Sequence, residues 1–134
     1  MTKNQTFFLL IFILTFFSCN DQKYNKNKWI NDDPSFYRVR RNMVNDIIDS
    51  KMLDNKFTND VITLIGKPNW TDTTNTGKTK KMNYTVQISY GFDIDPKFCK
   101  TLELEVDTTN NKIKSIMLNK ENDRRSFIEK FLTN

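Results

Sequence analysis

Histidine is absent from this sequence of 134 residues, and only two cysteines occur in it. Without an imidazole the chain cannot use histidine for acid-base catalysis or for metal ligation, so many enzyme mechanisms are excluded. A glycine-rich phosphate-binding loop and a calcium loop are also missing, because the residue spacings that define them do not occur. The carboxylates of Asp and Glu are the remaining candidates for catalytic groups.

Long apolar runs are equally scarce, and the one that occurs lies near the N-terminus. Lys3 precedes an apolar run over residues 7–17 that only Thr15 interrupts, and Ser18 and Cys19 follow it. This order is typical of a secretory signal. A membrane-spanning helix needs about 20 apolar residues, so the run is too short to remain as a span.

Ser18 and Cys19, directly behind the apolar run, resemble the lipobox of bacterial lipoprotein signal peptides. The resemblance implies that residues 1–18 are removed and that Cys19 carries diacylglycerol on its sulfur and an acyl chain on its amine. Apart from these covalent lipids, no cofactor is expected. An ordinary secretory signal and an uncleaved anchor are the alternatives. The two or three acyl chains of a mature lipoprotein would hold the protein durably on a membrane, because each buried methylene group contributes roughly 0.8 kcal/mol of binding free energy.

We therefore expect the protein in the bacterial cell envelope, anchored by lipid at the outer membrane and facing the periplasm, with the inner membrane and the cell surface as alternatives. Lipidation of Cys19 leaves Cys99 as the single thiol, so no intrachain disulfide forms. Cys99 is then either a small buried hydrophobe or a reactive or intermolecular thiol. Lys and Arg outnumber Asp and Glu by 21 to 16. For an exported protein this basic balance suits an anionic membrane or an acidic partner, not nucleic acid; no small-molecule substrate is expected.

The chain behind the signal divides into a tether and one domain. Residues 19–33 are polar, rich in Asn and Lys and without periodicity, which predicts a flexible tether. Trp29 and Ile30 within it are expected either to dock on the domain or to dip into the membrane interface. The domain is expected over residues 34–134, a length that suits a single unit.

Apolar residues at three- and four-residue spacing predict two helices at the start of this domain. The first runs from Pro34 to about Met52, with Asp33 as its cap. The second begins at Thr58 and stops at Gly66, which suits the left-handed position past a last helical turn.

Alternating apolar residues then predict three strands, at residues 82–92, 102–107 and 113–118, with residues 69–81 as a loop before them. A short helix after Asp123 ends the chain. We predict an α+β fold in which two helices pack on a three-stranded antiparallel meander (ααβββ), with a short C-terminal helix. The sheet face without helices is expected to be solvated or open to a partner.

The run Leu64-Ile65-Gly66-Lys67-Pro68, with Thr58 before it and the strand at residues 102–107 after it, resembles the small lipoproteins related to the outer-membrane assembly factor BamE. These proteins are also called SmpA/OmlA and belong to the group sharing the fold of β-lactamase inhibitor protein. The resemblance covers residues 36–118. It implies a BamE-like domain that binds an envelope protein, in outer-membrane protein assembly or envelope maintenance.

Basic side chains and one tryptophan supply a candidate interaction surface. Its members are Arg38 and Arg41 in the first predicted helix, and Trp70, Lys80 and Lys81 in the predicted loop. Such residues suit an anionic lipid surface or a partner protein, whereas the alternative is an ordinary solvated face.

Three functions remain open at this point. The first is a non-enzymatic, lipid-anchored protein-interaction module. The second is an inhibitor or immunity-type module that blocks an enzyme through the exposed sheet face. The third is an enzyme that uses Asp93 and Asp95 as a carboxylate pair, although turn formation at a strand end explains both residues better.

Overall fold

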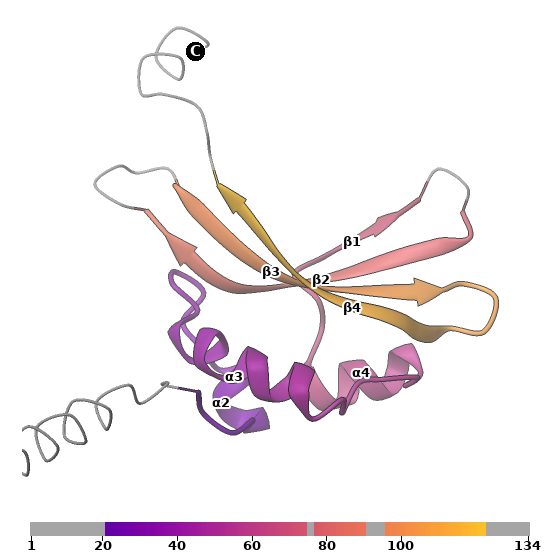
Figure 1. Cartoon of the computed structure of the whole chain (residues 1–134), viewed down its shortest axis with the longest axis horizontal. Coiled ribbons are helices and arrows are strands. Elements are labelled where there is room, and N and C mark those ends of the chain that lie inside the picture. The colour runs from indigo at the N-terminus through magenta and orange to yellow at the C-terminus, as the bar shows by residue number, and fades with distance from the viewer. Residues whose placement is uncertain (1–20, 75–76, 91–95, 123–134) are drawn as a thin grey trace, which may run out of the picture.

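The computed structural model describes residues 21–74, 77–90 and 96–122, which form a four-stranded antiparallel sheet with three helices on one of its faces (Figure 1). The helices are α2 (Lys26–Ile30), α3 (Arg38–Asp49) and α4 (Thr58–Ile65). The strands are β1 (Trp70–Thr73), β2 (Thr79–Ser89), β3 (Phe98–Asp107) and β4 (Lys112–Asn122), and they lie in this order across the sheet.

The inner face of the sheet carries the alternating apolar residues of the central strands. The register places Met82 opposite Leu104 and Tyr84 opposite Leu102, and all four side chains are buried. Alternate residues of a strand point to opposite faces, so the residues between them point away from the helices. The helices complete the core with Met43, Val44, Ile47, Val61 and Ile65. Burial of each such aliphatic side chain contributes about 1.5–3 kcal/mol.

The predicted three-stranded meander is wrong, because a fourth strand, β1, lies where a loop was predicted. β1 pairs with β2, with Trp70 opposite Asn83 and Thr73 opposite Lys80. All the residues of β1 are exposed. An edge strand that buries no side chain shows no alternation of apolar and polar residues, and so leaves no strand signal in the sequence. The general α+β class is confirmed.

The expected flexible tether over residues 19–33 is also corrected, because its described part is folded. Helix α2 lies within it, and its N-cap Asn25 accepts the Lys28 N–H at 3.1 Å. Trp29 is completely buried, and its indole N–H donates to the Ile65 carbonyl at 3.0 Å. Docking of Trp29 on the domain is therefore confirmed. Since α2 buries only this one side chain, no apolar periodicity predicts it.

Both helices predicted for the start of the domain form, as α3 and α4. Helix α3 begins later than predicted because Asp33 accepts the Ser35 N–H at 2.9 Å in a turn and Tyr37 adopts a left-handed conformation with φ 50°. Helix α4 begins at Thr58 and ends at Ile65, and Gly66 caps it with φ of +83°, as predicted. The predicted helix after Asp123 lies outside the described residues.

Candidate functional site

The sheet face that points away from the helices carries one row of side chains across all four strands. The register aligns Trp70 on β1, Asn83 on β2, Glu103 on β3 and Met117 on β4, and residues paired in this way share a face. Trp70 is 44% and Met117 45% exposed, whereas Asn83 and Glu103 are buried between them. The row therefore has exposed apolar side chains at both ends and two buried polar residues, Asn83 and Glu103, between them. We call these two residues the polar floor.

Hydrogen bonds hold the β1 end of this row. The carboxylate of Asp72 accepts the Trp70 indole N–H at 3.1 Å and the Asn83 side-chain amide at 2.9 Å. One carboxylate therefore fixes the plane of an exposed indole ring against the neighbouring strand. A ring held in this way loses little conformational freedom when a partner covers it.

The middle of the row is built around the Glu103 carboxylate. The Lys81 ammonium lies 2.9 Å from Glu103 Oε1, and the Asn119 amide donates to Oε2 at 3.2 Å. Oε1 is deeply buried, and Lys81 approaches it as an ion-pair partner outside ideal hydrogen-bond geometry. The Glu103 carboxylate raises the pKa of Lys81. The Lys81 side chain is thus held as an ammonium beside the carboxylate.

A second pair extends this face along β3 and β4. The Ser115 hydroxyl donates to Glu105 at 2.9 Å, and the Lys114 ammonium lies 3.6 Å from the same carboxylate. We call the whole set the outer sheet face, and its members are Trp70, Asp72, Lys81, Asn83, Glu103, Glu105, Ser115, Met117 and Asn119. An open groove of about 300 Å³ continues the set towards Lys120 and Glu121.

The five interaction residues predicted from the sequence do not form one surface. Trp70 and Lys81 belong to the outer sheet face. Lys80 precedes Lys81 in β2 and therefore points to the opposite side, where it lines a groove of about 450 Å³ near Phe57. Arg38 and Arg41 are exposed on α3, in the helical layer.

The sequence reasoning missed Asn83, Glu103 and Met117 as members of one site. A signal for Met117 was present, because Ile116, Met117 and Leu118 are consecutive apolar residues and a strand must place Met117 on the face opposite the other two. Asn83 and Glu103 carried no comparable signal. Their burial depends on the neighbouring strands, which the sequence pattern does not place.

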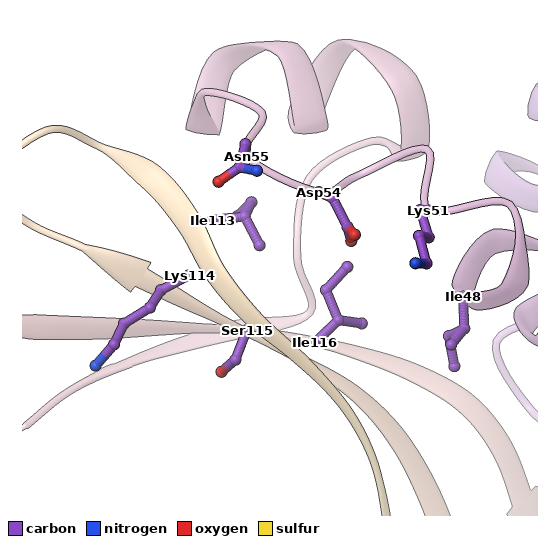
Figure 2. A pocket seen from close by; sticks show the side chains of 8 residues that line it. All are labelled: Ile48, Lys51, Asp54, Asn55, Ile113, Lys114, Ser115 and Ile116. Carbon is purple, nitrogen blue, oxygen red and sulfur yellow. The ribbon is translucent and has the colours of Figure 1, made fainter.

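A second depression lies at the edge of the sheet, between β4 and the connection from α3 to α4. It has a volume of about 340 Å³ and is lined by Ile48, Lys51, Asp54, Asn55, Ile113, Lys114, Ser115 and Ile116. Figure 2 shows Ile113 and Ile116 pointing towards this connection, while Lys114 and Ser115 point the other way. Edge strand β4 carries Lys112, Lys114 and Lys120, and edge lysines disfavour addition of a further strand. The outer sheet face is therefore the better candidate for docking.

Of the candidates not yet placed, Cys99 lies within the described residues. Cys99 is a half-buried free thiol whose sulfur lies 3.8 Å from the Thr101 hydroxyl oxygen. Asp93 and Asp95 lie outside the described residues. Within the described ranges, no three His, Cys, Asp or Glu side chains are grouped to hold a metal ion. None of the helices found there is long and apolar enough to cross a membrane.

Comparisons of the chain with protein-family models, with curated proteins and with solved structures found no match.

Proposed function

We propose that this protein is a lipid-anchored lipoprotein of the bacterial cell envelope whose domain binds another envelope protein through the outer sheet face. The short apolar run and Ser18-Cys19 support export and lipid anchoring. The location at the outer membrane, facing the periplasm, rests on the resemblance to BamE-related lipoproteins. The resemblance to BamE-related lipoproteins supports a role in outer-membrane protein assembly or envelope maintenance.

The observation that carries the binding proposal is the pair of exposed apolar side chains, Trp70 and Met117, at the two ends of one row. Three strand spacings separate the backbones of their strands, which is about 14 Å. Aromatic residues and methionine are enriched in protein interfaces, and tryptophan is frequent among the residues that dominate binding energy. A partner that covers both ends would also cover the polar floor between them.

The polar floor supports specificity because its groups are already arranged. Asp72 binds Asn83, while Lys81 and Asn119 bind Glu103. A partner must therefore match donors and acceptors whose positions are already fixed, and it does not have to order mobile side chains. Preorganisation of this kind lowers the entropic cost of association.

The same rigidity favours a second candidate, an inhibitor or immunity-type module that blocks an enzyme. Complexes of inhibitors with their enzymes typically form with little backbone movement, and the Trp70 ring held by Asp72 and Asn83 suits such rigid docking. This candidate differs from the first in the partner, which would be one soluble hydrolase.

A photo-crosslinking amino acid placed at position 117 in the full-length lipoprotein tests the proposal in intact cells. We expect crosslinks to an envelope protein, and we expect Trp70→Ala in the same chain to reduce their yield about tenfold or more. Phe57→Ala provides the matched control, because Phe57 is also an exposed aromatic residue (50%) but does not belong to the outer sheet face.

Equal yields from the Trp70→Ala and Phe57→Ala proteins would contradict docking on the outer sheet face. Recovery of one soluble hydrolase in place of an envelope protein would favour the inhibitor candidate. An unmodified Cys19 in the mass spectrum of the mature protein would contradict lipid anchoring.

A further inference from the structure

Residues 21–24, the first that the structure describes, are fixed to the domain by hydrogen bonds. Three hydrogen bonds hold them along α3: from the Gln22 N–H to the Asn42 carbonyl at 2.8 Å, from the Tyr24 N–H to the Asp46 carboxylate at 2.7 Å, and from the Asn45 amide to the Asp21 carboxylate at 3.0 Å. The Tyr24 hydroxyl also donates to the Leu64 carbonyl. The surface around Asp21 is therefore part of the folded domain.

The distance from this surface to the proposed lipid anchor is short. Cys19 precedes Asp21 by two residues, and each trans peptide unit advances the chain by at most 3.8 Å between Cα atoms, so the backbone spans no more than about 8 Å. The polar headgroup layer of a bilayer has a comparable thickness, about 5 to 8 Å on each side. A domain attached in this way cannot move away from the headgroups, and the side of the domain next to Asp21 must face them.

Asp21 lies beside α3, because the Asn45 amide of that helix donates to the Asp21 carboxylate. Helix α3 belongs to the helical side of the domain, opposite the outer sheet face (Figure 1). Residues 21–46 contain six cationic and four anionic side chains. Five of these cations are exposed, and we call them the basic face: Lys23, Lys26, Lys28, Arg38 and Arg41.

The acidic side chains of this segment are largely occupied within the domain. The carboxylate of Asp32 accepts the Arg40 backbone N–H at 2.7 Å, and those of Asp33 and Asp46 accept the backbone N–H groups described above. On the basic face, Arg38 lies 5.1 Å from the centre of the Phe36 ring and Arg41 donates to the Asn42 side chain at 3.5 Å. The exposed lysines Lys23, Lys26 and Lys28 are thus the cations best placed to extend towards an external anion. A lysine close to an anionic bilayer strengthens the attraction about fivefold.

We propose that the basic face rests directly on an anionic bilayer surface, so that the outer sheet face points away from the membrane. This orientation rests on the lipidation of Cys19, which belongs to the proposed function. It follows from two independent observations, the short reach of the chain before Asp21 and the charge of the surface beside it.

Fluorescence quenching by lipid headgroups tests the orientation. The full-length, processed lipoprotein with Cys99→Ser is reconstituted into vesicles that contain phosphatidylglycerol and a headgroup-linked quencher, with a fluorophore on Asn27→Cys or on Met117→Cys. Asn27 is exposed on α2 and Met117 on the outer sheet face. We expect the label at position 27 to be quenched several-fold more strongly than the label at position 117. Equal quenching, or stronger quenching at position 117, would overturn the proposal.

Amine acetylation of the wild-type lipoprotein gives the same information without a label. Lys23, Lys26 and Lys28 are expected to be protected several-fold in phosphatidylglycerol vesicles compared with detergent, whereas the exposed Lys56 and Lys78 react equally in both. Uniform protection of all these lysines would contradict a single bilayer-facing side.

Charge removal tests the contribution of the basic face. The variant Lys23→Gln/Lys26→Gln/Lys28→Gln is compared with the matched variant Lys56→Gln/Lys78→Gln/Lys114→Gln, and only the first is expected to weaken quenching at position 27. Equal effects of the two variants would contradict attraction through the basic face.

The failure of this inference can be told apart from failure of the proposed function. A lipoprotein whose Cys19 carries lipid, and whose labels are quenched equally, refutes only the orientation. A chain without lipid on Cys19, which does not float with vesicles of neutral lipid, refutes the anchoring on which the orientation rests.

Discussion

Replacing Arg40 by methionine removes a cation that joins three parts of the domain. The Arg40 side chain is buried, with 8% of the residue exposed. Its Nε donates to the Trp29 carbonyl at 3.0 Å, and its Nη1 donates to the Thr85 carbonyl at 3.2 Å and to Asn69 Oδ1 at 3.3 Å. The guanidinium also lies 5.2 Å from the centre of the Trp29 ring and 4.7 Å from that of Tyr37.

The expected loss follows from these contacts. Hydrogen bonds of a charged group contribute about 1.5 kcal/mol or more each, and the acceptors left without a donor add a desolvation penalty. The two contacts with aromatic rings contribute about 0.5–1 kcal/mol each. Burial of the guanidinium opposes these terms and lowers the pKa of Arg40, and methionine avoids that cost. We expect Arg40→Met to lower the free energy of unfolding by about 3 kcal/mol.

Urea denaturation followed by circular dichroism measures this change. Arg41→Met is the matched control, because Arg41 is the next residue of α3 and is exposed, so its substitution should change the free energy of unfolding by less than about 0.5 kcal/mol. Arg40→Lys should fall between the two, since a single ammonium cannot reach all three acceptors. A loss for Arg40→Met no larger than that for Arg41→Met would refute the idea that Arg40 joins α2, α3 and the sheet.

Three further predictions concern single side chains. Trp29→Ala is expected to cost about 3–5 kcal/mol because it empties a fully buried site; loss of hydrogen-exchange protection in α2 at normal protection of β3 would localise the effect. Gly66→Ala is expected to cost about 1 kcal/mol in urea denaturation, because φ is +83° there and the new Cβ would lie 3.4 Å from Ile30 Cγ1; unchanged stability would contradict this. Burial raises the pKa of Tyr84 above its ordinary value of 10.0. The protonated Tyr84 hydroxyl therefore contributes its full stabilisation of the fold below pH 10, and this contribution falls as the pH rises above 10. Thermal unfolding between pH 8 and about 11 should show this decline in the wild type and a smaller one in Tyr84→Phe.

The local parts of the fold could be predicted from the sequence. Helix α4 combines apolar spacing with a glycine at its end, and β2 and β3 alternate because one face of each is buried. Helix α2 and strand β1 could not be predicted in this way. In α2 only Trp29 is buried, and in β1 every residue is exposed, so neither segment shows the periodicity on which prediction depends.

The candidate site was only partly predictable for a different physical reason. Trp70 and Met117 lie far apart in the sequence, and three strand pairings must form before they share one row. Trp70 and Lys81 were recognised by residue type alone, and the same reasoning grouped them with Arg38 and Arg41, which the fold places in the helical layer. Residue type identifies candidates for contact, whereas the register of the sheet decides which of them act together.

The burial of Trp29 also bears on how the proposed lipid-anchored form could be released from its membrane. Many anchored domains can be released intact when a protease cuts a flexible stalk. Here a cut after residue 33 would remove α2 together with the proposed anchor and would expose the apolar site that Trp29 fills beside α3 and α4. With the proposed lipid on Cys19, proteolytic release at that point would therefore yield an unstable fragment, and the folded protein would remain on the membrane.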